Sequence, residues 1–370
     1  MMYRFSFHDL LHVCLDLPKD GLMKDLDLPF RCYETSREDG SCDLKLIVEP
    51  APFGVSPGPL MAVDHRFYVG PDYFYCSDAG GGGRWQAAVQ RQGACVVVRF
   101  YGTAGGKDRY FYPHLLPQNL ILLPLMEILL APKNTLLLHA AAVGKDDRCF
   151  LLVGRGSAGK TSLVMNLLRR GYRLLGDERV MVGIDGEASS FLMHNLTLQY
   201  KLDHLSGERF RDKERTVWGA AAKYLGYLWQ AYRDSSDITF HTLTKAKLRA
   251  IFFLNPQLGG DISLRPESYE RAGPRILLNN KAEWQKGYTF AVNNHGHYFS
   301  RYADILSFID PQSAIAAHWQ VMEEKIGRLL TDEIPLWDLA YPKNSLADPL
   351  NGVDKIAGLI LEAVQNGEAV

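Results

Sequence analysis

The sequence predicts an α/β protein, α+β overall, in which a mixed sheet flanked by helices follows a β-rich N-terminal region. Two observations support this class. Segments of β-type sequence, separated by turn residues, follow one another closely up to residue 112. After residue 117, apolar runs of strand length alternate with stretches of helical periodicity. We therefore expect two domains, residues 1–115 and 116–370, in this chain of 370 residues.

The composition argues against several kinds of partner. The hydrophobic fraction of 47% is that of a globular protein with an ample core. A net charge of −1 provides no basic field for nucleic acid or for an anionic membrane surface. The six cysteines form no C-x-x-C pair, which is typical of reduced thiols. Since the N-terminus also lacks a secretory pattern, we expect a cytoplasmic protein without a nucleic-acid or membrane partner.

The N-terminal region is expected to form an antiparallel sheet. Its predicted strands are rich in Val, Tyr and Phe, and turns containing Pro and Gly separate them. These strands are Asp43–Val48, Met61–Val69, Asp72–Cys76, Arg84–Gln90 and Ala94–Tyr101. Four glycines at 80–83 lack the lysine and the helix of a phosphate loop, so they predict a hairpin turn. Because an exposed sheet edge can capture an extended peptide, this domain is a candidate for substrate recognition.

The second region is expected to alternate strands and helices. A helix over 118–131 is too short to span a bilayer and contains Pro124 and Glu127. Apolar strands over 135–143 and 149–153, joined by a tight polar turn, predict an antiparallel hairpin. The remaining predicted elements are a helix capped by Gly171, strands at 172–175, 247–254 and 334–339, and helices at 217–233, 311–330 and 353–364. The apolar face of 217–233 suits core packing or a subunit contact, which leaves a homo-oligomer open.

The strand at 149–153 leads into a complete phosphate-loop motif. Residues 154–161 read GRGSAGKT, which matches G-x-x-x-x-G-K-[ST] between a strand and a helix. The glycines allow a tight turn whose N–H groups point at a phosphate, and the helix adds its positive end. Lys160 can reach the β- and γ-phosphates, and the Thr161 hydroxyl can bind Mg²⁺. The expected nucleotide-binding residues are Gly154, Arg155, Gly156, Ser157, Ala158, Gly159, Lys160, Thr161 and Ser162.

A pair of acids ends the next predicted strand. Asp177 lies 17 residues after Lys160, with one helix between them. If their strand lies beside the phosphate-loop strand, both carboxylates emerge near the γ-phosphate. Glu178 and Thr161 are candidate Mg²⁺ ligands, because Mg²⁺ prefers hard oxygen donors. The alternative for the pair is a solvated turn, and His139 on the preceding apolar strand is either a core histidine or a site residue.

Three segments together resemble the catalytic domain of HPr kinase/phosphorylase, a family with the phosphoenolpyruvate-carboxykinase type of nucleotide fold. They are Leu138-His139-Ala140, the loop GRGSAGKTSL and the run LRRGYRLLGDERV at 168–180. The close match covers 136–182, and a looser one extends to the later strands. The resemblance implies an HPr-kinase-like P-loop domain that binds ATP and Mg²⁺, with Asp177 as general base and His139 beside the γ-phosphate. Glu178 departs from the family, which has Asp there, and the first 112 residues do not resemble its usual N-terminal domain.

The expected function is therefore that of an ATP-dependent kinase whose catalytic residues are Asp177, His139 and Lys160. The expected acceptor is a hydroxyl, foremost a Ser of a protein or a peptide, and relatives of the family act on precursor peptides of lasso-type natural products. Neither HPr as substrate nor a reverse phosphorylase reaction is implied. Two alternatives stay open: a small-molecule kinase that uses the same site, and a nucleotide-sensing regulatory NTPase.

Two further segments are candidates for supporting roles. Residues 201–215 contain five Lys or Arg and four Asp or Glu. They form either a solvated loop or a segment that closes over the phosphates, as mobile loops do in kinases. His295 and His297 share one loop, but no third ligand lies nearby in sequence, so we do not expect a metal site there.

Overall fold

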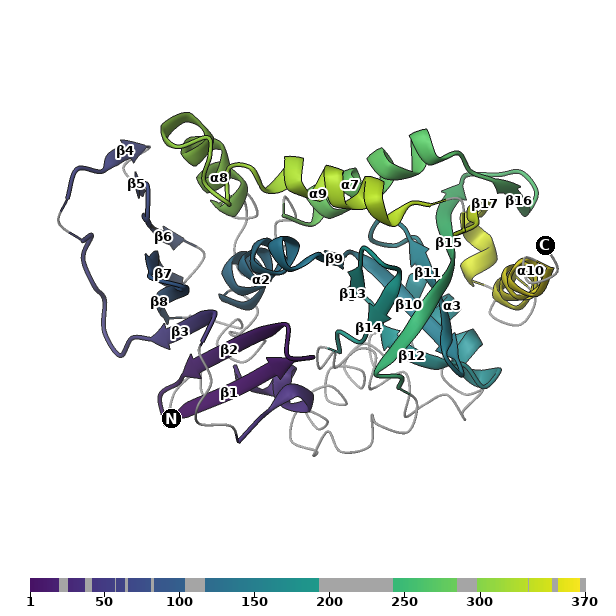
Figure 1. Cartoon of the computed structure of the whole chain (residues 1–370), viewed down its shortest axis with the longest axis horizontal. Helices are drawn as coiled ribbons and strands as arrows, with labels where there is room; N and C mark the ends of the chain where they lie inside the picture. The colour runs from purple at the N-terminus through teal and green to yellow at the C-terminus, as the bar shows by residue number, and fades with distance from the viewer. Residues whose placement is uncertain are drawn as a thin grey trace. The chain divides into compact units, whose positions relative to one another are not determined.

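The computed structural model describes residues 1–19, 26–36, 42–56, 58–63, 66–80, 83–103, 117–192, 242–284, 298–331, 333–347 and 352–366. Within these ranges the chain is α/β, with two mixed sheets and six α-helices, in agreement with the α+β class (Figure 1). It forms two compact units, each of which is built from two separate stretches of the chain. Unit 1 comprises residues 1–137 and 280–325, and unit 2 comprises residues 138–279 and 326–370. The predicted boundary at residue 115 therefore lies inside unit 1.

Unit 1 is built on a sheet that contains the predicted N-terminal strands, except that the predicted strand at 61–69 is divided into two antiparallel strands. Its strand order is β1-β2-β3-β8-β7-β6-β5-β4. The strands are β1 Met2–Phe7, β2 Leu11–Asp16, β3 Leu44–Val48, β4 Met61–Val63, β5 Phe67–Gly70, β6 Tyr73–Gly80, β7 Gly83–Gln92 and β8 Cys95–Thr103. The run from β4 to β8 is antiparallel, and Gly80 pairs with Gly83 across the predicted hairpin.

The first two strands and two parallel pairings were not predicted. β1 and β2 form an antiparallel hairpin, in which Phe5 and Val13 are buried. β2 pairs in parallel with β3, and β3 pairs in parallel with β8, so the expectation of a purely antiparallel sheet was wrong. The long connection from β2 to β3, which includes the 3₁₀ turn η1 (Leu28–Tyr33), returns the chain to the same end of the sheet, as a parallel pair requires.

A continuous helical stretch follows this sheet and confirms the predicted helix at 118–131. The helical elements described after this sheet are η3 Gln118–Leu122, α2 Leu123–Leu130, η4 Ala131–Lys133, α3 Lys160–Arg169, α7 Tyr269–Trp284, α8 Tyr298–Ile309, α9 His318–Leu329, η6 Lys343–Ala347 and α10 Gly352–Asn366. In unit 1, the buried Glu127 of α2 accepts hydrogen bonds from Asn280 Nδ2 and Trp284 Nε1, each at 3.1 Å, and lies 3.3 Å from His318 Nε2. These partners compensate the carboxylate for its lost hydration.

Unit 2 is built on the sheet that contains the phosphate-loop strand. Its strand order runs β12-β10-β11-β15-β14-β13, and β17 pairs with both β15 and β16. The strands are β10 Ala140–Lys145, β11 Arg148–Val153, β12 Arg173–Gly176, β13 Val180–Gly183, β14 Glu187–Ser189, β15 Lys245–Gln257, β16 Ser263–Pro266 and β17 Leu336–Pro342. The predicted hairpin of β10 and β11 is confirmed. Because β15 is parallel to both β11 and β17, all three strands end at the same edge of the sheet.

The strand that carries the acid pair, β12, does not lie beside the phosphate-loop strand β11. It pairs antiparallel with β10, and β10 separates it from β11. Since β10 is antiparallel to both neighbours, β12 runs parallel to β11 and ends at the same edge of the sheet. The acids therefore emerge at the edge where the phosphate loop begins. Their strand is separated from the phosphate-loop strand by one intervening strand, β10.

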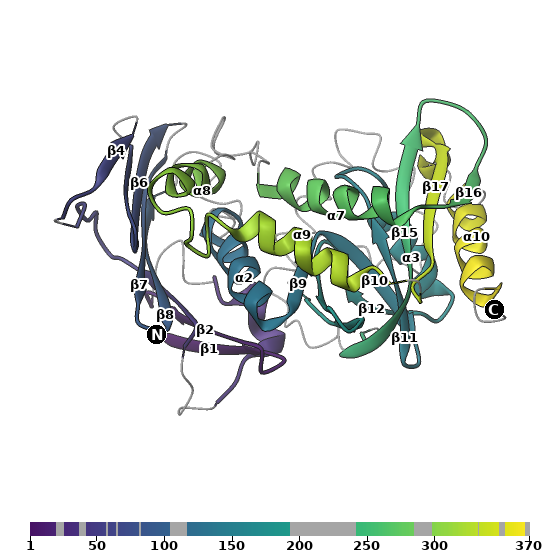
Figure 2. The same ribbon diagram turned by 45° about the horizontal axis from the view of Figure 1, so that its top comes forward.

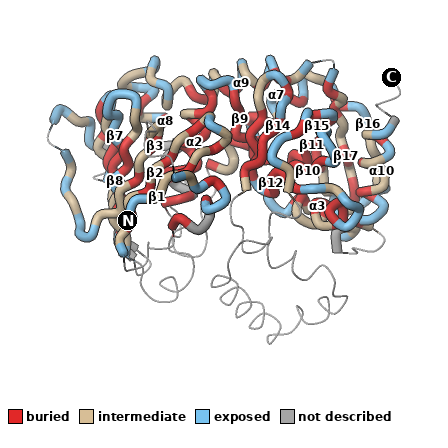
Figure 3. The backbone as a smooth tube through the Cα atoms, turned by 60° about the horizontal axis from the view of Figure 1, so that its bottom comes forward, coloured by how far each residue is buried: buried red, intermediate tan, exposed pale blue. Residues whose placement is uncertain are grey.

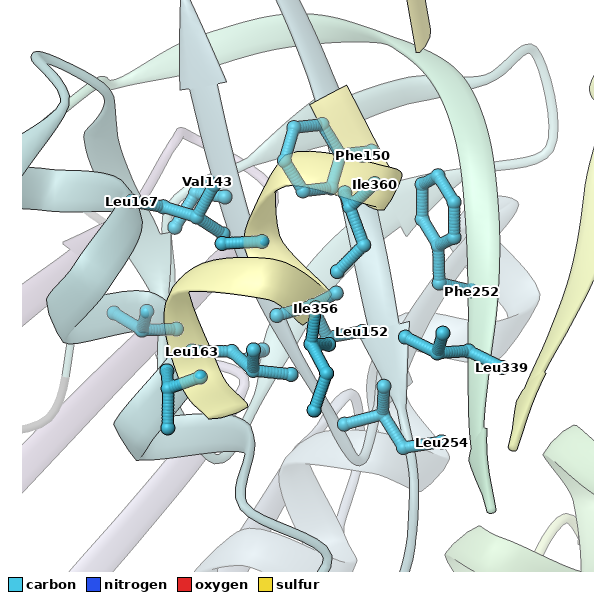
Figure 4. Packing of buried hydrophobic residues seen from close by; sticks show 14 of the residues in the cluster. Val143, Phe150, Leu152, Leu163, Leu167, Phe252, Leu254, Leu339, Ile356 and Ile360 are labelled. Carbon is cyan, nitrogen blue, oxygen red and sulfur yellow. The ribbon is translucent and has the colours of Figure 1, made fainter. Parts of the chain in front are cut away.

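Helices cover both faces of this sheet. Leu163 and Leu167 of α3 and Ile356 of α10 pack with Phe252 of β15 in one buried cluster (Figure 4). Arg275 of α7 stacks over Phe253, whose side chain points to the opposite face, with its guanidinium carbon 4.5 Å from the ring centre. Figure 2 shows α7 and α10 on opposite sides of β15 and β17. The strands between these helices are largely buried, as the red tube in Figure 3 shows.

The predicted helix at 353–364 corresponds to α10, and the predicted helix at 311–330 corresponds to α9 only from His318 on. Three predictions concern residues outside the described ranges: the helix at 217–233, the mixed-charge segment at 201–215, and the loop of His295 and His297. Within the described part of the chain, no helix combines the length and the apolar character needed to cross a bilayer.

Candidate active site

The phosphate loop joins β11 to α3 with backbone conformations that small residues favour. Ser157 and Gly159 have positive φ angles of 67° and 84°. The Ala158 N–H donates to the Arg155 carbonyl at 3.0 Å, and Gly159 is the N-cap residue of α3. Arg155, Gly156 and Ser157 are exposed at the positive end of this helix. This arrangement favours a bound anion.

Two contacts hold the base of the loop in place. A Cβ atom on Gly154 would lie 3.0 Å from Ala158 Cβ and 3.1 Å from Leu254 Cβ, so the close approach favours glycine. The hydroxyl of Tyr341, on β17, donates to the Ala158 carbonyl. Burial raises the pKa of the Tyr341 phenol, so this hydroxyl stays a neutral donor.

Lys160 is buried, and its ammonium group lies inside the loop. Its Nζ donates to the Gly154 carbonyl at 2.5 Å and to the Arg155 carbonyl at 3.4 Å. The same Nζ lies 3.0 Å from His139 Nε2. A protonated lysine has only donors, so a protonated Lys160 requires Nε2 to be the acceptor of this bond. The ammonium group is thus already surrounded by acceptors that phosphate oxygens can replace.

Asp177 reaches the loop from the turn that follows β12. The Thr161 hydroxyl donates to Asp177 Oδ2 at 2.9 Å, and the Asp177 side chain is buried. The turn requires glycine at 176, because a Cβ atom there would lie 1.9 Å from the Arg179 carbonyl oxygen. This tight turn directs the carboxylate toward the first turn of α3.

Glu178 differs from Asp177 in its surroundings. Its side chain is exposed, whereas those of Asp177 and Arg179 are buried. We expected Glu178 and Thr161 to bind Mg²⁺ together. In the structure the Thr161 hydroxyl instead donates a hydrogen bond to Asp177. The structure therefore brings Lys160, Thr161 and Asp177 together with His139, and leaves Glu178 at the solvent-facing position of the turn.

His139 occupies a bend that divides the predicted strand 135–143 into β9 (Thr135–Leu138) and β10. The next residue, Ala140, pairs with Val153, which directly precedes the loop. His139 is therefore level with the start of the phosphate loop, and its side chain is buried. Its carbonyl oxygen accepts a hydrogen bond from Asn279 Nδ2 of α7 at 2.6 Å.

The donor set fits a nucleoside triphosphate with Mg²⁺. The helix end and Lys160 suit phosphate oxygens, and the Thr161 hydroxyl and the Asp177 carboxylate are hard oxygen donors. Mg²⁺ is commonly held by one or two carboxylates together with phosphates and water, rather than by an all-protein cage. The described residues contain no group of three or more His, Cys, Asp or Glu side chains arranged to hold a metal ion.

Two residues of the site were missed by sequence reasoning. Tyr341 contacts Ala158 across 183 residues, and Asn279 contacts His139 across 140 residues. Neither belongs to a motif. A single signal was available for Asn279, since two adjacent asparagines inside an amphipathic helix are unfavourable for helix formation and indicate specific partners.

Comparison with known proteins assigns no family. No protein-family model matches the chain, and no curated protein is significantly similar to it.

Proposed function

We propose that this chain is an ATP-dependent kinase that transfers the γ-phosphoryl group to a hydroxyl. One observation carries the proposal: the buried carboxylate of Asp177 lies against the Thr161 hydroxyl of the phosphate loop. Backbone N–H groups and Lys160 are sufficient to hold phosphates. A carboxylate at this place adds a group that can take the proton of an incoming hydroxyl, which phosphoryl transfer to that hydroxyl also needs.

Lys160 binds the donor in this proposal. Its Nζ exchanges the carbonyls of Gly154 and Arg155 for oxygens of the β- and γ-phosphates. The ammonium donor is charged in both sets of bonds, but the phosphate oxygens are anionic whereas the carbonyls are neutral, so the exchange favours the bound nucleotide. His139 lies against Nζ and limits the positions that the ammonium group can take.

Asp177 acts on the acceptor. As the acceptor oxygen bonds to the γ-phosphorus, the bond from that phosphorus to the bridging oxygen breaks, and the electron pair leaves with ADP. An oxygen of Asp177 takes the hydroxyl proton, while Thr161 holds the carboxylate in place. Thr161 and an acid of the pair Asp177-Glu178 would hold Mg²⁺, which would neutralise part of the phosphate charge.

The proposed acceptor is a Ser side chain of a protein or a peptide. The Ser acceptor follows from the resemblance to HPr-kinase-like enzymes. The N-terminal sheet is the proposed recognition element, because an exposed strand edge can capture an extended peptide. A small hydroxyl compound at the same site and a regulatory NTPase without an acceptor are the alternatives that experiments have to separate.

The experiment compares Asp177→Asn with wild type for binding of ATP without Mg²⁺ and for phosphoryl transfer with Mg²⁺. We expect Asp177→Asn to bind metal-free ATP within about threefold of wild type, because Lys160 and the loop are kept, but to transfer about 10²–10⁴-fold more slowly, which is the usual contribution of a general base. Asp147→Asn, at an exposed carboxylate in the β10–β11 turn, is the matched control and should match wild type. Unchanged transfer in Asp177→Asn contradicts the proposed role of Asp177.

A further inference from the structure

Two adjacent asparagines of α7 donate to the backbone of the segment that precedes the phosphate-loop hairpin. Asn279 Nδ2 donates to the His139 carbonyl at 2.6 Å, and Asn280 Nδ2 donates to the Leu137 carbonyl at 2.9 Å. Both side chains are buried. Their local geometry is closely matched, but only Asn279 contacts a residue whose side chain belongs to the candidate active site.

The two amides differ in how fully they are satisfied. Asn280 also donates to Glu127, within a cluster of buried polar partners. The Asn279 Oδ1 atom is buried and has no hydrogen-bond partner among the residues that the structure describes. A buried acceptor without a partner lowers stability, which offsets part of what the bond to the His139 carbonyl contributes. Asn279 is therefore expected to contribute less to stability than Asn280.

The bond to Asn279 fixes the backbone from which the imidazole projects. His139 lies in the bend between β9 and β10, outside both strands. The Asn279 amide anchors the carbonyl of this residue, and the imidazole then meets Lys160 Nζ at 3.0 Å. The chain of contacts thus runs from α7 through His139 to the lysine that is expected to hold the phosphates.

We propose that Asn279 is a positioning residue for phosphoryl transfer, which acts by holding the His139 backbone so that the imidazole faces Lys160. This role rests on the proposed kinase function. Productive sites hold their groups within about 0.5 Å, and a displacement of about 1 Å can cost about 100-fold in rate. Loss of the amide leaves the binding loop unchanged, so its effect should fall on turnover rather than on nucleotide binding.

The experiment compares Asn279→Ala with Asn280→Ala. For Asn279→Ala we expect a kcat about 10- to 100-fold below wild type, a KM for ATP within about threefold, and shifted ¹⁵N signals of the His139 imidazole. For Asn280→Ala we expect a lower unfolding temperature, with kcat within about threefold of wild type and unshifted His139 signals. All rates are measured well below the unfolding temperature of each variant.

Two results overturn the role of Asn279. One is a wild-type kcat together with wild-type imidazole signals in Asn279→Ala. The other is an equal loss of kcat in Asn279→Ala and Asn280→Ala, which indicates a purely structural effect. If Asn279→Ala does not fold, Asn279→Ser replaces it, because serine keeps a short hydrogen-bond donor. Wild-type ¹⁵N signals of the His139 imidazole together with a wild-type kcat in that variant likewise overturn the role. Should the wild type transfer phosphoryl to no acceptor, the proposed function fails, while the imidazole comparison still tests whether Asn279 positions His139.

Discussion

Two neighbouring acids of similar chemistry have different surroundings because of a single turn. Asp177 is buried against the Thr161 hydroxyl, and Glu178 is exposed. The sequence offers both as carboxylates after one strand, and only the backbone path from Gly176 to Arg179 separates them. The same holds for His139, for which burial alone would suit a core residue. Its contact with Lys160 Nζ supports the interpretation as a site residue.

Cys14 offers a test of residue-scale electrostatics outside the site. A hydrogen bond with Cys42, aided by the charges of Arg4 and Lys45, lowers the pKa of the Cys14 thiol to about 7 despite its partial burial. Burial raises the pKa of Cys149 to about 12. Since the thiolate is the reactive form, iodoacetamide should label Cys14 with a midpoint about pH 7 and leave Cys149 unlabelled in the folded protein at pH 9.

Peptide mapping by mass spectrometry measures this labelling. A midpoint near the ordinary thiol value for Cys14 contradicts the expectation. The lowered pKa also implies that the free energy of unfolding gains a contribution from Cys14 as the pH rises from about 7 toward the ordinary thiol pKa, because the folded state then binds fewer protons than the unfolded state.

At the scale of elements, the turn after β12 is the most constrained part of the site. Gly176→Ala places a methyl group where the Arg179 carbonyl oxygen lies, and backbone cannot move away cheaply. We expect the free energy of unfolding to fall by about 3 kcal/mol, the upper part of the usual range for overpacking, together with loss of the Asp177–Thr161 contact. Urea unfolding measures the loss.

Gly358→Ala in α10 is the matched control. A Cβ atom at Gly358 meets open space, and alanine is the better helix former, so this variant should gain about 0.5–1 kcal/mol. Equal destabilisation by the two substitutions contradicts the steric explanation for Gly176.

Elements that depend on neighbouring residues in the sequence could be predicted. The phosphate loop, the β10–β11 hairpin and the cap of α3 all follow short patterns. Gly171 indeed has a φ of 85°, and the Tyr172 N–H donates to the Leu167 carbonyl, as in a Schellman cap. Pairings between distant segments leave no such pattern. The place of β12 beside β10, and the contact of Tyr341 with the loop, depend on packing that no short window contains.

At the scale of the whole molecule, the β-rich N-terminal region is not complete by itself. Phe74 of β6 stacks on Tyr302 of α8, with ring centres 4.0 Å apart. Lys133, after α2, donates to the Leu10 carbonyl at 2.6 Å and pairs with Asp43 at 2.9 Å. The sheet of unit 1 thus packs against helices that lie beyond residue 115. The boundary at residue 115, which was predicted from the sequence pattern, does not take this packing into account.

We expect a fragment of residues 1–115 to lack a cooperative unfolding transition, because it leaves apolar residues such as Phe74 without their packing partners. Circular dichroism during thermal unfolding, compared with the full chain, measures this. A cooperative transition and dispersed amide signals in the isolated fragment would show that residues 1–115 fold independently, against this expectation.

The central claim is that the residues around His139 and Asp177 transfer phosphoryl to a hydroxyl. The most direct measurement incubates the full chain with Mg²⁺, γ-labelled ATP and an array of serine peptides and small hydroxyl compounds. We expect label on a serine peptide with wild type and with Asp147→Asn, and none above background with Asp177→Asn. ATP that is bound or hydrolysed while every acceptor stays unlabelled would contradict the kinase proposal and favour a regulatory NTPase.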